Sequence, residues 1–249
     1  MTSFKPSKKK GDYSSNKVRS SRLRSNNNPQ QYVKGYAEFY KLKFKVSKDV
    51  LIPRPETELL VDAVLLSLLD HKVAKQSITI LDVGCGSGNI AISLIKNNPD
   101  LNMIASDISP KALKVAKQNA KLHSVLDKID FVESDLLTSF CCFDELEEDL
   151  IIVTNLPYIP SDRIPKLDSS VRDFEPHLAL DGGKDGFNLY RKLFAQIIEK
   201  RGKPKLIVCE IDHTQAKLAI KEAQKYFPKA KIEVKLDLAK KQRILKITD

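Results

Sequence analysis

An apolar run that ends in closely spaced glycines constrains the fold of this chain more than any other feature. Residues 78–83 read Ile-Thr-Ile-Leu-Asp-Val, and Gly84, Gly86 and Gly88 follow at alternate positions. Glycines in such a place let the backbone turn sharply and approach a ligand without interference from a Cβ atom. The segment therefore predicts a buried strand that passes through a ligand-binding turn into a helix.

Strands and helices alternate from this turn to the end of the chain. We predict strands at residues 78–83, 102–106, 129–133, 150–154, 205–211, 232–236 and 243–247, and helices at 89–96, 110–123, 186–200 and 214–226. This alternation predicts an α/β fold, with a mostly parallel sheet of seven strands between two layers of helices. Because no helix separates the last two strands, one strand should run antiparallel. A ligand is then expected beyond the carboxyl ends of the strands.

The N-terminal part of the chain is basic and low in apolar residues. Residues 1–48 contain thirteen Lys or Arg against two acidic side chains, so they carry nearly all of the net charge of +10. We expect residues 1–31 to form a disordered tail. Attraction to RNA or the ribosome and a merely solubilising role explain this tail equally well. The Cys spacing predicts no metal site, and the lack of long apolar runs predicts a cytoplasmic protein without a membrane segment.

Three units follow from this reading of the chain. After the tail at 1–31, residues 32–56 should form a short β-ribbon and a Pro-rich linker, because Phe39, Phe44 and Val46 alternate with polar residues. Residues 57–249 should form the α/β domain. We expect Thr57 to be the N-cap of the helix that follows the linker.

A carboxylate follows the second strand of the α/β domain at the distance that nucleoside binding requires. Asp107 lies 23 residues after Gly84, where it can accept hydrogen bonds from both hydroxyls of a ribose. The alternating glycines, preceded by Asp82, resemble motif I of the Rossmann-like class I methyltransferases. That resemblance implies S-adenosyl-L-methionine as the cofactor. The cofactor-binding residues it implies are Gly84, Cys85, Gly86, Ser87, Gly88, Asp107, Asp135, Leu136 and Asn155, with Asp135 and Leu136 at the adenine.

A second motif, Asn155-Leu156-Pro157-Tyr158, follows the fourth strand at the same edge of the sheet. It resembles the (Asn/Asp)-Pro-Pro-(Tyr/Phe) motif of methyltransferases that act on planar nitrogens, with Leu156 in place of the first proline. The Asn155 amide oxygen and the carbonyl of Leu156 could accept both N–H bonds of such a nitrogen and orient it. Tyr158 could hold the planar group against its ring. We expect these four residues to be the catalytic and substrate-binding residues. Ribosomal-RNA adenine dimethylases share a similar motif, so glutamine and adenine both remain open on this motif alone.

Two further segments resemble one family closely. Residues 50–61, which contain Pro53-Arg-Pro-Glu-Thr-Glu58, and residues 171–186 resemble the release-factor glutamine N(5)-methyltransferases, the HemK/PrmC family. The resemblance runs from about residue 30 to the C-terminus. It implies methyl transfer to the glutamine of the Gly-Gly-Gln loop of a class I peptide chain release factor. It also places Arg54, Glu56 and Glu175 near the cleft. The family has a helical bundle before the ribbon, and we expect it to be missing here.

Three other functions were weighed. An adenine amino-group methyltransferase acting on RNA or DNA is favoured by Asn-Leu-Pro-Tyr and the basic tail, but no dedicated basic or aromatic target domain is evident. A catalytically silent scaffold would have no need of the intact residues of both motifs. A dehydrogenase that uses NAD would need the spacing Gly-x-Gly-x-x-Gly, which the turn at Gly84 does not have.

Overall fold

The computed structural model describes residues 27–69, 78–141 and 149–248. Residues 1–26 of the predicted tail lie outside the described residues. A short helix, α2 (Gln30–Lys34), follows and was not predicted. The predicted unit boundaries at residues 31 and 56 stay predictions. Among the described residues, no helix is both long and apolar enough to cross a membrane.

A single large sheet organises the chain. Its strands are β3 (Ile78–Val83), β4 (Asn102–Asp107), β5 (Ile129–Glu133), β6 (Asp149–Thr154), β7 (Leu206–Glu210), β8 (Lys231–Leu236) and β9 (Gln242–Thr248). They lie in the order β5-β4-β3-β6-β7-β9-β8. Pairing is parallel from β5 to β7, whereas β9 runs antiparallel to both β7 and β8. The seven strands and the single antiparallel strand are confirmed.

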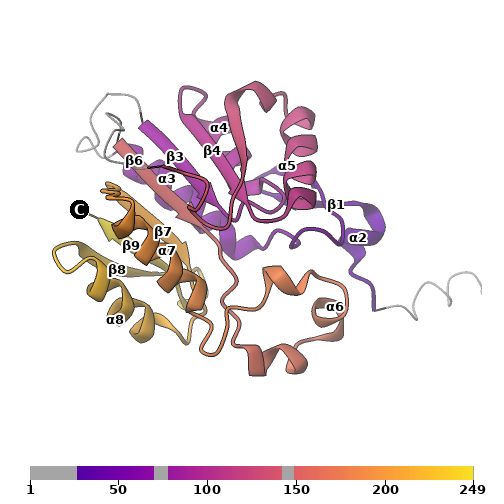
Figure 1. The fold of residues 1–249 in the computed structure, drawn as a ribbon. Coiled ribbons are helices and arrows are strands. Elements are labelled where there is room, and N and C mark those ends of the chain that lie inside the picture. The colour runs from indigo at the N-terminus through magenta and orange to yellow at the C-terminus, as the bar shows by residue number, and fades with distance from the viewer. Residues whose placement is uncertain (1–26, 70–77, 142–148, 249) are drawn as a thin grey trace, which may run out of the picture.

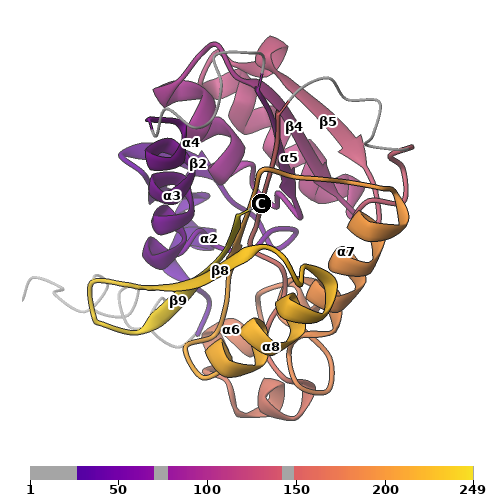
Figure 2. The ribbon, with the colours of Figure 1, turned by 90° about the vertical axis from the view of Figure 1, so that its left-hand side faces the viewer.

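Helices cover both faces of this sheet, as Figures 1 and 2 show. One face packs against α3 (Glu58–Leu69), α4 (Asn89–Asn97) and α5 (Pro110–Leu122), and the other against α7 (Asn188–Glu199) and α8 (Ala216–Tyr226). Side chains of a strand point alternately to the two faces. In β6, Ile151 and Val153 accordingly join the core with α3 and α4, while Leu150 and Ile152 join the core with α7 and α8.

The predicted ribbon is a separate antiparallel sheet of β1 (Tyr36–Phe39) and β2 (Leu42–Lys45). Its inner side chains, Phe39 and Phe44, are fully buried against the domain. Asn119 of α5 accepts a hydrogen bond from the backbone of Lys45 at 2.7 Å and donates one back at 3.0 Å. The ribbon is thereby fixed to α5, and it holds the start of the linker beside the carboxyl end of the sheet.

The linker ends in a 3-10 turn at Pro55–Thr57 that leads directly into α3. The prediction that Thr57 would be the N-cap of this helix was wrong. Thr57 is buried, and its hydroxyl donates a hydrogen bond to Glu210 at the end of β7, 2.7 Å away. At an N-cap the hydroxyl oxygen would accept from a helix N–H, whereas here the hydroxyl proton is donated to a buried carboxylate, which is a strong acceptor.

A long connection joins β6 to α7. It holds short helical turns at Ser161–Lys166 and His177–Ala179 and the helix α6 (Ser169–Arg172), none of which was predicted. Figure 1 shows this segment as a separate lobe beyond the carboxyl ends of the strands. A bridge between Ile159 and Asp181 closes the base of the lobe. The lobe and the linker therefore face each other across the edge where the sequence predicts the ligand.

Candidate active site

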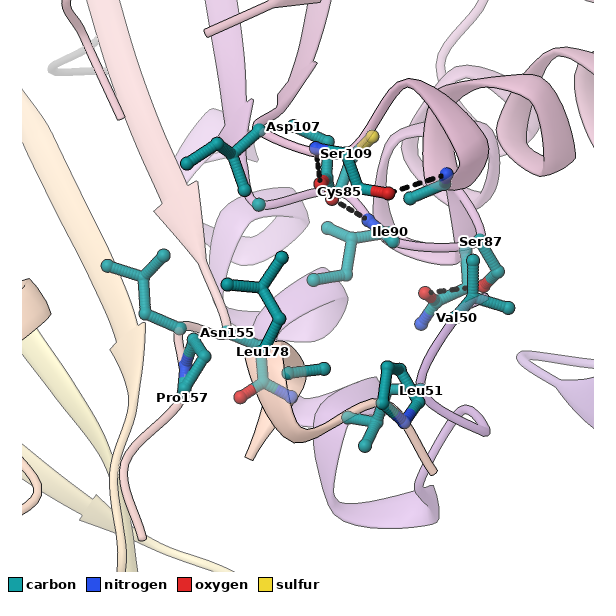
Figure 3. A pocket seen from close by; sticks show the side chains of 18 of the residues that line it. Val50, Leu51, Cys85, Ser87, Ile90, Asp107, Ser109, Asn155, Pro157 and Leu178 are labelled. Atoms are coloured by element: carbon teal, nitrogen blue, oxygen red, sulfur yellow. Dashed lines mark hydrogen bonds between the residues drawn. The ribbon is translucent and has the colours of Figure 1, made fainter. Parts of the chain in front are cut away.

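A pocket opens at the carboxyl ends of β3, β4 and β6, between the linker and the lobe (Figure 3). Its lining includes most of the residues that the sequence singled out: Gly84, Cys85, Gly86, Ser87, Asp107, Asp135, Leu136, Asn155, Leu156 and Pro157. Two of the predicted site residues, Gly88 and Tyr158, are not among the lining residues. Both motifs thus meet in one cavity, although 67 residues of sequence separate their nearest ends.

The glycine turn forms one wall of the pocket. The backbone N–H groups of Gly84 and Cys85 both donate to the carbonyl of Ser106, at 2.8 and 2.9 Å, which joins the turn to β4. Gly84, Gly86 and Gly88 all have positive φ, between 55° and 77°. Cys85 is buried, and burial raises the pKa of its thiol well above the usual range, so the side chain stays neutral. The wall is therefore backbone and small side chains, which a bulky ligand can approach closely.

Asp107 lies at the end of β4 beside this turn. Its two carboxylate oxygens accept hydrogen bonds from the backbone N–H of Gly86, at 2.9 Å, and of Ser109, at 2.8 Å. Burial raises the pKa of Asp107, and the backbone hydrogen bonds oppose that rise. Each carboxylate oxygen can accept a second hydrogen bond. An orientation fixed in this way fits the two hydroxyls of a ribose, and the wall of glycines beside it fits the rest of an adenosyl group.

Asp135 and Leu136 follow β5 at the same edge. Leu136 is buried and has a φ of +54°, a conformation that non-glycine residues rarely adopt. The carboxylate of Asp135 pairs with the amine of Lys192 on α7, 2.5 Å away, and is about two-fifths exposed. This ion pair was not predicted from the sequence. It joins α7 to the rim of the pocket on the side where the adenine is expected.

The second motif begins where β6 ends. The Asn155 amide nitrogen donates to the hydroxyl of Thr57 at 3.1 Å. Leu156 is buried, and its side chain lies against Gly84. Figure 3 places Asn155 and Pro157 at one end of the pocket and Asp107 at the other. The amide is therefore in the same cavity as the glycine turn.

Tyr158 is held by two hydrogen bonds, and the prediction that its ring holds the substrate stays a prediction. Its hydroxyl donates to a carboxylate oxygen of Glu210 at 3.0 Å, and its carbonyl accepts from Gln215 at 2.9 Å. Burial and the neighbouring carboxylate raise the pKa of Tyr158 well above its usual range, so the hydroxyl keeps its proton. Tyr158 is therefore held through its hydroxyl by Glu210 and through its backbone carbonyl by Gln215.

The linker and the lobe complete the pocket with apolar groups that the sequence did not assign. Val50, Leu51 and Pro53 line it from the linker, and Leu178 lines it from the lobe. Arg54 also lines it, and its guanidinium donates to the carboxylate of Glu175 in the lobe. The only signal for these residues was the family resemblance, which placed Arg54 and Glu175 near the cleft. Thr57 lies in the segment that resembles the family but was expected only as a helix N-cap, and Glu210 had no signal by type or spacing.

Comparisons with known proteins bear first on the class. Residues 80–174 match the family described as a methyltransferase domain. The catalytic domain of human METTL16 in complex with an RNA hairpin superposes with a TM-score of 0.65 at 16% identity, over 84% of this chain and 76% of that one. Its N-terminal domain in complex with SAH gives 0.58 at 15% identity, over 84% and 76%. At such low identity these likenesses concern the fold. The match to the methyltransferase domain, together with the glycine turn, defines a Rossmann-like methyltransferase that uses S-adenosyl-L-methionine.

The particular family follows from closer relatives. The release factor glutamine methyltransferase of Lactococcus lactis is 37% identical over 222 residues, which cover 89% of this chain and 77% of the relative. The enzyme of the same name from Dictyoglomus turgidum is 37% identical over 90% of this chain and 77% of its own length. The enzyme from Streptococcus pneumoniae is 36% identical over 89% and 75%. This chain belongs to the release factor glutamine methyltransferase family.

Proposed function

We propose that this chain methylates the side-chain amide nitrogen of the glutamine in the Gly-Gly-Gln loop of a class I peptide chain release factor. The observation that carries the proposal is the position of Asn155, whose amide shares one pocket with the glycine turn and Asp107. The names of the three relatives compared above point to the same substrate. S-adenosyl-L-methionine supplies an electrophilic methyl group on a sulfonium.

The nucleophile in this reaction is poor, because the lone pair of an amide nitrogen is delocalised. Positioning and hydrogen bonding therefore have to supply most of the catalysis. In the proposed arrangement, the amide oxygen of Asn155 accepts one N–H of the substrate and the carbonyl of Leu156 accepts the other. Two acceptors fix the plane of the substrate amide and raise the electron density on its nitrogen as the transition state forms.

The carbonyl of Leu156 is available for this role. The hydroxyl of Tyr190 lies 3.4 Å from it, but the same hydroxyl makes a much shorter bond to the carbonyl of Glu210. A tyrosine hydroxyl has one proton to donate, and here it donates that proton in a hydrogen bond to the nearer carbonyl, that of Glu210. Tyr190 thus holds the backbones at the ends of β6 and β7 together and leaves an acceptor toward the pocket.

The other residues that line the pocket can be assigned to the ribose, the adenine and the amino-acid part of the cofactor. Asp107 would hold the ribose hydroxyls, Asp135 and Leu136 the adenine, and the turn from Gly84 to Gly88 the amino-acid part. Leu51 of the linker and Leu178 of the lobe would shield the reacting groups from water, because their apolar side chains line the same cavity as Asn155. Pro157 and Tyr158 would limit the depth to which a substrate side chain can enter.

The proposal is tested by supplying labelled methyl on S-adenosyl-L-methionine to purified release factor and, in parallel, to ribosomal RNA and DNA. We expect label on the Gly-Gly-Gln glutamine, located by mass spectrometry. Asn155→Ala should lower the rate by about 100-fold or more while cofactor affinity is kept. Label on adenine instead would overturn the choice of substrate. A large loss of cofactor affinity in Asn155→Ala would assign this residue to the cofactor.

Residues 1–31 provide a second element of the proposal. Their positive charge supports contact with ribosomal RNA, where a release factor could be met in the cytoplasm. Sedimentation with ribosomes should show weaker binding after removal of residues 1–31, and the difference should shrink as salt is raised. Equal binding with and without these residues would leave the tail a solubilising segment.

A further inference from the structure

Behind Asn155 lies a connected set of side-chain hydrogen bonds that no cofactor or substrate contact requires. Asn155 donates to Thr57 at 3.1 Å, and Thr57 donates to one carboxylate oxygen of Glu210 at 2.7 Å. Tyr158 donates to the other oxygen of Glu210 at 3.0 Å. The four groups come from the ends of β6 and β7 and from the turn before α3. Glu210 therefore joins both ends of the Asn155–Tyr158 motif to the sheet.

The direction of each bond in this set is determined by the group at its centre. An ionised carboxylate can only accept hydrogen bonds, so Thr57 and Tyr158 must both donate to Glu210. A threonine hydroxyl has one proton, and once it is directed to Glu210 the oxygen can only accept from Asn155. The NH₂ group is the only donor of an asparagine side chain. It must therefore face Thr57, and the amide oxygen of Asn155 must face the other way.

The protonation state of Glu210 follows from its surroundings. Glu210 is only 1% exposed, and burial raises its pKa. The hydroxyls of Thr57 and Tyr158 and the positive charge of Arg243 act in the opposite direction, while Glu56 adds a small rise. Each oxygen of the carboxylate receives a hydroxyl donor, and such hydrogen bonds are stronger to the ionised carboxylate than to the neutral acid. This arrangement favours the ionised form on which the bond directions depend.

We propose that Glu210 and Thr57 are positioning residues that set the orientation of the Asn155 amide. Through Thr57, the buried carboxylate turns the amide oxygen of Asn155 into the pocket, where it can accept the N–H of the substrate. A reversed amide would present its NH₂ group to the N–H of the substrate and would repel it. Glu210 holds the Tyr158 ring at the same time. This inference rests on the proposed function, because it explains how a planar amide is received.

The alternative is that Glu210 only anchors α3 to the sheet. The two ideas differ in what a shape-preserving change does. Thr57→Val keeps the size of the side chain but removes the hydroxyl, whereas Thr57→Ser keeps the hydroxyl. For the positioning role, Thr57→Val should lower kcat for methyl transfer to release factor by about 10- to 100-fold, with the KM for cofactor little changed. Thr57→Ser should restore most of the lost rate.

Two further variants make the comparison selective. Glu210→Gln keeps the shape of the side chain and adds a donor, so Thr57 can direct its proton to Asn155 and favour the reversed amide. Its kcat should fall by a factor similar to that of Thr57→Val. Thr248→Val, at the opposite end of the sheet beside Leu206, serves as the control for a Thr-to-Val change and should retain the wild-type rate.

A measurement without turnover separates this inference from the proposed function. In ¹⁵N NMR spectra, the side-chain NH₂ signals of Asn155 can be assigned by their loss in Asn155→Asp. They should shift in Thr57→Val and Glu210→Gln and stay close to the wild-type positions in Thr57→Ser. If the wild type methylates no release factor, the proposed function is wrong. The NMR signals of the Asn155 side chain still test whether Thr57 and Glu210 set the orientation of its amide.

The outcomes are then distinct. Equal kcat values for Thr57→Val and Thr57→Ser, with unchanged Asn155 signals, would overturn the positioning role. A parallel loss of folding and activity in Thr57→Val, with Glu210→Gln as active as wild type, would reduce Glu210 to an anchor for α3. A lowered kcat in Glu210→Gln with normal affinity for SAH and shifted Asn155 signals supports the proposal, even if Thr57→Val fails to fold.

Discussion

The guanidinium of Arg54, which lines the pocket from the linker, donates to the buried carboxylate of Glu175 in the lobe. Glu175 is 1% exposed at its side chain, whereas Arg54 is 32% exposed. Glu175 also accepts from the backbone N–H of Ile52 at 3.2 Å. Two segments that are 121 residues apart are thereby held across the cavity.

We predict that Arg54→Ala destabilises the fold more than Glu175→Gln. Removal of Arg54 leaves a buried carboxylate without its counter-charge, which costs about 3 kcal/mol at most at this partly exposed site. Glu175→Gln removes the charge itself and can keep the bond to Ile52. Urea unfolding of both single variants and the double variant gives the coupling energy, expected at about 1–2 kcal/mol. The exposed pair Lys231–Glu233 is the control and should couple much more weakly. Coupling as weak as in that pair would contradict the role of this ion pair in holding the two segments together.

Asp107 carries the second prediction. Asp107→Ala should weaken the binding of SAH by about 10- to 100-fold, because charge-assisted hydrogen bonds to ribose hydroxyls are lost. The N–H of Gly86 also loses its acceptor in this variant, so the turn itself becomes less fixed. Asp107→Asn keeps one acceptor oxygen and should give an intermediate affinity. Isothermal titration calorimetry measures each value, with Asp130→Ala, an exposed residue of β5, as the control. Unchanged affinity in a folded Asp107→Ala would refute the ribose assignment.

Much of the fold and part of the site could be predicted from the sequence, because the signals are local. The apolar strands and the glycine spacing determine the sheet, the antiparallel β9 and the position of Asn155 at the end of β6. The contact between Thr57 and Glu210 spans 153 residues, and one sequence contains no record of such a pairing. Residues of these types are common at helix starts and strand ends, where their usual roles are caps and exposed charges.

Glu175 and Tyr158 also have polar partners that could not be predicted from the sequence. The family resemblance placed Glu175 near the cleft without indicating a partner, and the structure shows it buried and paired with Arg54. For Tyr158 the sequence indicated a role for the ring and no partner for the hydroxyl, which donates to the buried carboxylate of Glu210. In both cases the position of the side chain is determined by a polar partner that is distant in the sequence. Polar partners are chosen by tertiary contacts, which local pattern does not reveal.

The close approach of Gly84 and Leu156 gives the third prediction. A Cβ atom on Gly84 would lie 3.1 Å from Cδ2 of Leu156, which is buried and has little room to move. Gly86 also has a positive φ, but a Cβ there would meet nothing within 4 Å. Gly86→Ala should therefore cost only the backbone strain, about 1–2 kcal/mol of unfolding free energy, and Gly84→Ala about 1 kcal/mol or more beyond that.

Chemical unfolding without cofactor measures this difference, since both glycines line the cofactor pocket. The comparison also probes the residue that stands in place of the usual proline, because Leu156 supplies the contact. Equal losses of unfolding free energy in Gly84→Ala and Gly86→Ala would mean that the side chain of Leu156 moves away from the new Cβ atom without an energetic penalty.

The last prediction concerns Asp82, which is fully buried at the end of β3, just before the glycine turn. Burial, and to a smaller extent the charge of Asp107, raise its pKa from 3.8 to about 7, although the backbone N–H of Ala91 donates to it at 3.1 Å. Its other oxygen has no hydrogen-bond partner within the described part of the chain. Because the pKa is higher in the folded state than in the unfolded state, the folded protein binds more protons between pH 4 and pH 7. The stability that protonated Asp82 provides is therefore complete below pH 4 and is lost as the pH rises toward 7.

Asp82→Asn cannot ionise and should remove this dependence. The unfolding free energy of the wild type, measured relative to that of Asp82→Asn, should fall by up to about 1.4 kcal/mol for each pH unit between pH 4 and pH 7 and level off above. Urea unfolding at several pH values measures the difference, which cancels the titration of groups common to both proteins. Asp100→Asn, at an exposed position after α4, controls for the loss of one carboxylate. A difference between wild type and Asp82→Asn that stays constant across this range would show that Asp82 is ionised in the folded protein, with the turn around Gly84 supplying donors to it.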